Sequence, residues 1–256
     1  MKVADLINAL AIPPGACVEK RVPKKILMEQ GAPTQADKRN IQDGIEDMFW
    51  IAALKPSNVA VPVYRDEVRE YLEIAVLSAT LRSKAKASRL VELIHRSIPY
   101  PTVLLFAQAK SVTFSLAHKR QSLGEAGQVV VDGDIVTVDI SKECELEATF
   151  MASLAVAKQP AVNLYALYQS WMNRAEELIA ARITGHYALS ETLSDAAVRK
   201  EVIKDHEKIQ RELAALRADA VKEKQINRRV EINLKIKQLE AERNAKMRIL
   251  KSGEAR

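Results

Sequence analysis

The sequence predicts an α+β fold: a mixed or antiparallel sheet with packed helices, followed by a long C-terminal helical, coiled-coil-like region. Three observations support this class. Residues 89–120 have the pattern of a helix, a proline turn and two strands. Asp132-Gly133 separates two alternating apolar runs, as a hairpin turn does. Residues 194–250 contain neither Gly nor Pro and carry apolar residues at helical spacing.

The segment of residues 89–120 shows the plan of the domain most clearly. Its first part has apolar residues at helical spacing, and Pro99 and Pro101 end that helix. Residues 102–107 form an apolar run of strand length. Residues 111–116 alternate between polar and apolar side chains, which is typical of a half-buried strand. We therefore expect a helix followed by two neighbouring strands.

Residues 1–47 predict two helices and one segment of undecided type. An amphipathic helix at residues 3–10 is stopped by Pro13, Pro14 and Gly15. The short apolar run at residues 26–28 fits either a helix or a strand. Thr34 is a suitable N-cap, and a helix from there is expected to run to about Gly44 or Asp47.

Residues 48–81 predict strands. Residues 48–54 are apolar throughout, which fits a strand buried on both faces or the end of the preceding helix. A strand is expected at residues 59–63, and residues 69–81 predict one long strand. Ser83 or Ser88 is expected to cap the next helix.

Beyond residue 120 the pattern is a loop, a hairpin and two helices. The hairpin pairs residues 128–131 with residues 135–140 across the Asp132-Gly133 turn. Residues 145–156 predict a short helix, and residues 163–183 predict a longer one that ends at Gly185.

The last stretch begins at Ser194 and Asp195, which can cap a helix, and runs to about Leu250. Its apolar spacing slips between Glu223 and Val230, which indicates a stutter or a corner between two helices. One continuous helix would be roughly 85 Å long. We expect an α+β domain at residues 1–160 and a helical region at residues 161–256, with a long basic helix or a helical hairpin.

The net charge of +6 is concentrated at the C-terminal end. From Asp195 onward there are 17 Lys or Arg and 11 Asp or Glu, whereas the rest of the chain has 22 of each. A basic excess on one element favours contact with phosphates. The tail is therefore a candidate for contact with nucleic acid.

The composition also bears on location. No apolar run approaches the roughly 20 residues that span a bilayer, and Asp5 interrupts what would be a signal sequence. Cys17 and Cys144 lie far apart, with no disulfide or zinc pattern. We expect a cytoplasmic protein without a membrane partner.

Glu70 and Glu73 are weak candidates for catalytic carboxylates. A metal-dependent nuclease of the restriction type needs an acidic residue and then an acid-x-Lys sequence, which hold Mg²⁺ and orient water. Ile74 and Ala75 follow Glu73, so that lysine is missing. We expect Glu73 to pair with a cation across the sheet.

Two basic groups end neighbouring elements: His95-Arg96 and His118-Lys119-Arg120. If they meet, they form one basic patch that grips a phosphate or a partner carboxylate; the alternative is a solvated rim of charge. The other candidate binding residues are cations near the N-terminus and in the C-terminal stretch: Lys24, Lys25, Lys222, Lys224, Arg228, Arg229 and Lys235.

Motifs of the common enzyme classes are missing from the sequence. There is no GxxxxGK[ST], GxGxxG or GxSxG. His95 and His118 alone lack the third and fourth ligands that zinc requires. We expect no metal and no cofactor, and a binding or scaffolding role in preference to an enzymatic one.

Several phrases occur in order along the chain: VPKKILMEQGAPTQADKRNIQDGIEDMFWIAALKPSN, YRDEVREYLEIAVL, RLVELIHRSIPYP, FSLAHKR and KEKQINRRVEINLKIKQLEAE. Together, from about Arg21 to Glu242, they resemble a prokaryotic family of unknown function. Its genes lie beside Swi/Snf-type or other superfamily 2 helicases and DNA methyltransferases, in restriction-modification-like and phage-defence loci. The resemblance implies a companion subunit of a DNA-translocating or DNA-modifying complex.

Three hypotheses follow for the function. The first is a non-catalytic accessory subunit of an antiviral defence or restriction-like system, which binds a helicase or DNA methyltransferase subunit. The second is a DNA-binding module that contacts double-stranded DNA. The third is a divergent metal-dependent nuclease subunit centred on Glu70 and Glu73. Self-association through the C-terminal helices is a further candidate interaction.

Overall fold

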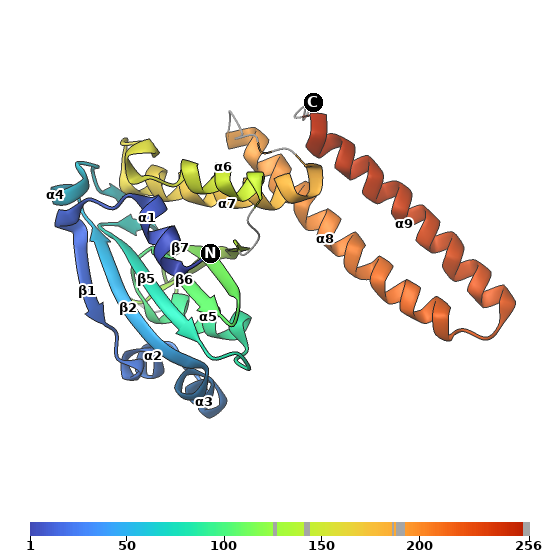
Figure 1. The fold of residues 1–256 in the computed structure, drawn as a ribbon, viewed down its shortest axis with the longest axis horizontal. Helices are drawn as coiled ribbons and strands as arrows, with labels where there is room; N and C mark the ends of the chain where they lie inside the picture. Colours follow the sequence, from blue (N-terminus) through green and yellow to red (C-terminus); the bar gives the residue numbers. More distant parts are fainter. Residues whose placement is uncertain (125–126, 141–143, 186, 188–192, 253–256) are drawn as a thin grey trace. The chain divides into compact units, whose positions relative to one another are not determined.

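The chain divides into two units, Met1–Ala175 and Glu176–Arg256. A computed structural model describes residues 1–124, 127–140, 144–185, 187 and 193–252 (Figure 1). The first unit, called here the sheet unit, mixes helices and strands, and the described part of the second, the helical unit, contains helices. The predicted α+β class is therefore confirmed. The division between the two units lies inside helix α7 (Leu164–Thr184).

A six-stranded mixed sheet organises the sheet unit, with strand order β1-β2-β5-β6-β7-β8 (Figure 1). The strands are β1 (Cys17–Arg21), β2 (Ile45–Leu54), β5 (Ile74–Leu81), β6 (Thr102–Gln108), β7 (Ser111–Gln121) and β8 (Val129–Asp139). Neighbours are antiparallel except β5 and β6, which are parallel and joined by helix α5 (Ala87–Ser97). A separate ribbon pairs β3 (Tyr64–Arg65) with β4 (Glu70–Tyr71).

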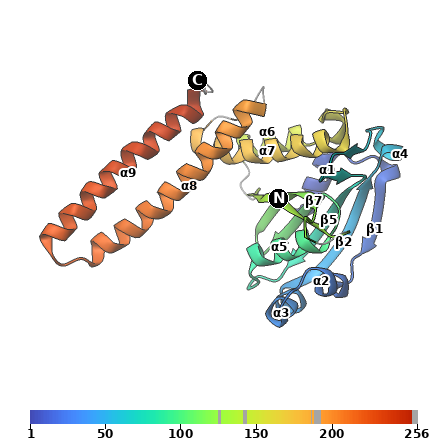
Figure 2. The same ribbon diagram turned by 180° about the vertical axis from the view of Figure 1, so that it is seen from behind.

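Helices cover both faces of the sheet (Figure 2). On one face, α2 (Lys24–Gln30), α3 (Gln35–Gly44) and α5 bury a cluster that includes Leu77 and Leu104. On the other lie α1 (Val3–Leu10), α6 (Glu145–Ser153) and the start of α7. There, Phe114 of β7 meets Phe150 of α6 with ring centroids 5.7 Å apart. Short helical turns complete the unit: η1 (Pro14–Ala16), α4 (Pro56–Val59) and η2 (Val156–Lys158).

Several predicted elements are confirmed, and local chemistry explains why they form. The amide of Asp37 donates to Thr34 Oγ1 at 3.1 Å, which caps α3 as expected. Asn163 caps α7 in the same way through the amide of Ala166, at 2.8 Å. Gly185 follows α7 with φ +82°, a conformation that favours glycine. The two undecided segments, residues 26–28 and 48–54, lie in α2 and β2.

The predicted hairpin at Asp132-Gly133 is wrong. Residues 129–139 form the single strand β8, which pairs with β7 from Gln121 opposite Val129 to Thr113 opposite Asp139. Gly133, at φ +78°, lies where the register shifts between Leu116 and His118. The same Asp-Gly pair that suits a tight turn therefore forms a β-bulge here. The opposite edge strand, β1, also has an irregular register, beside Glu19 at φ +49°.

Three smaller predictions are also wrong. The expected strand at residues 59–63 is not formed, since Pro56–Val59 is the short helix α4 and residues 60–63 have no regular structure. The long strand at residues 69–81 is divided into β4 and β5. Neither Ser83 nor Ser88 caps α5, because the N-cap position is Lys86 and carries no side-chain hydrogen bond.

The helical unit contains a hairpin of α8 (Leu193–Lys222) and α9 (Ile226–Ser252). Residues 223–225 join the two helices, so the slip in the sequence pattern is a corner and not a stutter (Figure 1). Three ion pairs cross between the helices: Arg217 with Glu240 at 2.7 Å, Lys235 with Glu212 at 3.3 Å, and Lys246 with Asp205. The last two follow the antiparallel order of the hairpin. None of the described helices has the length and apolar character needed to cross a membrane.

Candidate functional site

The two candidate carboxylates are neutralised by neighbouring cations. Glu70 pairs with Arg65 at 2.8 Å across the β3–β4 ribbon, and Glu73 pairs with Lys55 at 2.9 Å. The hydrogen bond to Glu73 raises the pKa of Lys55. Among the described residues, no group of three or more His, Cys, Asp and Glu side chains could hold a metal ion. The geometry thus matches the structural pairing expected for Glu73.

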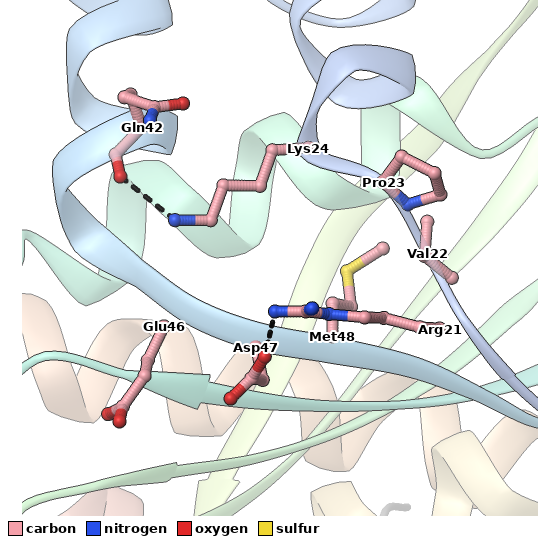
Figure 3. Close-up of a pocket in the computed structure, with 8 residues that line it drawn as sticks. All are labelled: Arg21, Val22, Pro23, Lys24, Gln42, Glu46, Asp47 and Met48. Carbon is pink, nitrogen blue, oxygen red and sulfur yellow. Dashed lines mark hydrogen bonds and ion pairs between the residues drawn. The ribbon is translucent and has the colours of Figure 1, made fainter.

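Lys24 and Arg82 cap the C-terminal end of α3. Lys24 Nζ donates to the carbonyl of Gln42 at 2.9 Å (Figure 3), and Arg82 Nη1 donates to the carbonyl of Asp43 at 3.2 Å. The amide of Arg82 also donates to the carbonyl of Gly44 at 2.8 Å. Since the last carbonyls of a helix lack partners within the helix, both cations have a structural role here. Burial, and then the charge of Arg82, lower the pKa of Lys24.

A cavity of about 380 Å³ lies beside Lys24, and Arg21 and Asp47 line it (Figure 3). These two residues form an ion pair at 2.5 Å (Figure 3). The neighbouring candidate Lys25 pairs with Glu29 at 3.6 Å on the surface of α2. The cations of this region are therefore occupied by contacts within the sheet unit.

His95 and Lys119 meet, but in the interior and not in a surface patch. Lys119 is only 2% exposed, and its amine donates to the backbone carbonyl of the fully buried His95. His95 Nε2 lies 3.0 Å from Ser115 Oγ, and its Nδ1 has no hydrogen-bond partner within the described chain. A phosphate or partner carboxylate outside the protein cannot reach either side chain. The expectation of an exposed patch containing these two residues is therefore wrong.

Burial controls the protonation of this pair. It lowers the pKa of the Lys119 amine to about 7. Burial, and then the nearby Lys119, lower the pKa of His95 to about 3. Because no carboxylate contacts the amine among the described residues, the charged form of Lys119 is not compensated. At neutral pH the buried amine of Lys119, which links β7 to the end of α5, is therefore only partly protonated.

The two arginines of the predicted patch remain accessible but are paired. Arg96 forms an ion pair with Glu92 at 2.7 Å, one turn earlier on α5. Arg120 lies 3.6 Å from Asp132, which also pairs with Arg69 at 2.8 Å. The pair of Arg96 is exposed and therefore weak, so this guanidinium group can still exchange partners, whereas Arg120 and Asp132 are half-buried.

His118 belongs to an aromatic cluster that the sequence interpretation missed. Its Nδ1 lies 2.5 Å from the hydroxyl of Tyr71, and its Nε2 lies 2.9 Å from Gln169 Oε1. Since that oxygen only accepts, Nε2 carries the proton and Tyr71 donates to Nδ1. The Tyr165 ring stacks on His118 at 5.2 Å and on Tyr64 at 4.8 Å. Both ring nitrogens are thus used in fastening the β3–β4 ribbon and α7 to the sheet.

The cations at the corner of the hairpin differ from the candidate residues of the sheet unit in their exposure and pairing. Lys222, Lys224, Arg228 and Arg229 are exposed. Within the part of the chain that the structure describes, none of the four has an ion-pair partner. Lys235 is the exception among the predicted cations of this region, because it pairs with Glu212.

Next to these cations, α9 carries exposed apolar side chains that the sequence interpretation also missed. Ile226 is 69% exposed, Val230 is 51% exposed and Leu234 is 57% exposed. They recur every four residues, so they form one row along the helix, called here the outer stripe. Their four-residue spacing is present in the sequence.

Comparison with known proteins gives a family and no activity. A family model described as Domain of unknown function (DUF4391) matches residues 10–242. No curated protein and no solved structure matches the chain.

Proposed function

The chain belongs to the DUF4391 family, and since that family is defined as a domain of unknown function, we propose from the geometry that this protein is a non-catalytic accessory subunit. It binds a partner protein through the α8–α9 hairpin. The observation that carries the proposal is the outer stripe, a row of large apolar side chains left uncovered on a helix that already packs against a neighbour.

The stripe is not a by-product of the hairpin core. At about 100° per residue, Val230 and Ile232 point about 200° apart, and so do Leu234 and Ile236. Ile232 and Ile236 lie on the inner face of α9, which is the face toward α8 where the ion pairs cross. Helix α9 is therefore apolar on two opposite faces, and α8 covers one of them. A helix with two apolar faces is typical of the central helix of a bundle.

The candidate site residues of the sheet unit do not form an exposed binding surface of this kind. Its candidate carboxylates are paired, and His95 and Lys119 are buried. His118 bonds inside the aromatic cluster. These contacts favour a scaffold role for the sheet unit and a binding role for the hairpin.

The resemblance to a family encoded beside helicases and DNA methyltransferases suggests the partner. In this proposal the chain is the accessory subunit of a restriction-like or phage-defence complex, and the hairpin docks on the helicase or methyltransferase subunit.

Co-expression with the neighbouring subunits tests this function. We expect the chain to co-elute with a partner in size-exclusion chromatography. Lysine cross-linking should join that partner to Lys222, Lys224 or Lys235 on the hairpin, and not to Lys84 or Lys110, which are exposed on the sheet unit. A chain that elutes alone, or cross-links confined to the sheet unit, would contradict the proposal.

Direct contact with duplex DNA is a second candidate, favoured by the four exposed cations at the hairpin corner. Cations without partners can release counterions from phosphates, so binding should weaken steeply with salt. The test is a mobility shift of plain duplex at about 50 mM salt. Arg228→Glu with Arg229→Glu should abolish the shift, whereas absence of any shift with the unaltered protein rules this candidate out.

A further inference from the structure

We infer that the partner supplies an acidic amphipathic helix, which packs along the outer stripe of α9 on the side opposite α8. This inference rests on the proposed function and names the chemistry of the partner. It is argued from the two faces of α9, because the inner face shows how this helix packs against another helix, α8.

On the inner face, α9 combines an apolar row with cations that meet carboxylates of α8. Ile232, Ile236 and Leu239 are half-buried there. Beside them, Lys235 pairs with Glu212, and Lys246 pairs with Asp205. The contact thus joins apolar packing with ion pairs. Helix α8 supplies the carboxylate in these two, and α9 supplies it in the third, which joins Glu240 to Arg217.

The outer face of α9 repeats two parts of this pattern, the apolar row and the cations beside it. The apolar row is Ile226, Val230 and Leu234. Three residues after Ile226 comes Arg229, and three residues after Leu234 comes Lys237, so these cations lie along one flank of the stripe. Both are exposed, and neither has an ion-pair partner in the described ranges. The carboxylates that would complete the pattern have to come from another chain.

Charge decides between the possible occupants. Residues 222–237 contain six Lys or Arg and two Glu, so this part of the hairpin is strongly basic. A second copy packed on the same stripe would bring like charges together, which is unfavourable. Duplex DNA would satisfy the cations but leave Ile226, Val230 and Leu234 in water. A helix with apolar residues on one face and Glu or Asp on its flanks satisfies both kinds of side chain.

The test uses the full chain and two synthetic helical probes of about 20 residues, with leucines at the a and d positions of each heptad. One probe carries glutamate on its flanks and the other carries lysine. In fluorescence anisotropy, we expect the acidic probe to bind at least about ten-fold more tightly than the basic one. Equal affinity for the two probes, or no binding of the acidic probe, would overturn the inference.

Two sets of variants locate the contact. Val230→Asn with Leu234→Gln should weaken binding of the acidic probe at least about ten-fold. Arg229→Glu with Lys237→Glu should reverse the preference toward the basic probe. Val162→Asn is the matched control, because Val162 is an exposed valine of the sheet unit and should not affect binding. Circular dichroism should show unchanged helix content in every variant. Unchanged binding of the acidic probe by the Val230→Asn, Leu234→Gln variant would overturn the inference. The inference would also fail if the unaltered chain sediments as a dimer and this variant sediments as a monomer.

The natural complex separates this inference from the proposed function. If the Asn/Gln variant still co-elutes with the partner of the unaltered chain, the accessory role stands and the outer stripe is not the contact. If the unaltered chain co-elutes with no partner, the accessory role itself fails, whatever the probes show.

Discussion

The sheet unit and the helical unit differ in how completely their side chains are covered. In the sheet unit, helices pack on both faces of the sheet, and even a lysine and a histidine lie in the interior. In the hairpin, α9 is covered on its inner face and leaves large apolar residues exposed on its outer face. Apolar burial stabilises a fold, whereas exposed apolar rows are available for binding. We therefore expect the same substitution to have different consequences in the two units.

The largest effect is expected from a pair of Leu→Ala substitutions. Leu104 is fully buried in the sheet unit, so Leu104→Ala should lower the free energy of unfolding by about 2 to 5 kcal/mol. Leu234→Ala on the outer stripe should change it by no more than about 0.5 kcal/mol. Urea unfolding followed by circular dichroism reports on both units. Equal losses would show that Leu234 is covered in solution.

The next effect concerns the pH dependence of stability. The folded pKa of Lys119 is about 7, below the ordinary value of 10.5, so the unfolded chain binds more protons between these values. Stability should therefore rise with pH from 7 to 9, by about 2 kcal/mol from this group. Lys119→Met should remove that rise.

The control for this prediction is Lys110→Met, which alters an exposed lysine of the same unit and should keep the pH dependence of the unaltered protein. Because Lys119→Met also removes the donor to the carbonyl of His95, the readout is the slope of stability against pH and not its absolute value. A slope that persists in Lys119→Met would show that the amine is solvated.

A smaller difference is expected between two tyrosines. Tyr71→Phe removes the donor to His118 Nδ1 in a buried cluster and should cost about 1 to 2 kcal/mol. Tyr64→Phe removes a hydroxyl that donates an exposed hydrogen bond to the Asp66 carboxylate, and this should lower the free energy of unfolding by less than about 0.5 kcal/mol. Trp50 and Trp171 both lie in the sheet unit, so their fluorescence follows its unfolding. A larger loss for Tyr64→Phe would contradict the assignment of the cluster.

The smallest effect is expected inside the hairpin. Lys235 and Glu212 form an exposed ion pair, so Lys235→Ala should lower stability by less than about 0.5 kcal/mol, and added salt should reduce the difference further. Thermal unfolding at low and high salt measures it. A loss above about 1 kcal/mol would mean that the pair is shielded from solvent.

Local signals in the sequence predicted much of the fold. Thr34 before α3 and Gly185 after α7 act through their own backbone neighbours, and a short sequence is enough to identify them. Asp132-Gly133 could not be interpreted in the same way. A positive φ at Gly133 serves a tight turn and a bulge equally well, and pairing with β7 over the whole of β8 decides between them.

The candidate site was less predictable, because burial depends on partners that are distant in sequence. Lys119 and His95 are residue types usually found at the surface, and only the approach of α5 to β7 places them inside. Among the exposed cations of the hairpin corner, Lys222, Arg228 and Arg229 lie on helices, and Lys224 lies in the connection between them. The outer stripe was visible in the sequence as four-residue spacing, but it could not be called exposed until the inner face of α9 was known.

The irregular edge strands have a further consequence for the behaviour of the protein at high concentration. Regular edge strands invite another sheet to add to them, which leads to fibres. Here the register is irregular in both edge strands, in β1 beside Glu19 and in β8 at Gly133, so neither strand offers a long regular template for pairing. Replacing Gly133 with a residue that disfavours positive φ would act against that protection. The effect would be read as aggregation on storage and not as a loss of binding.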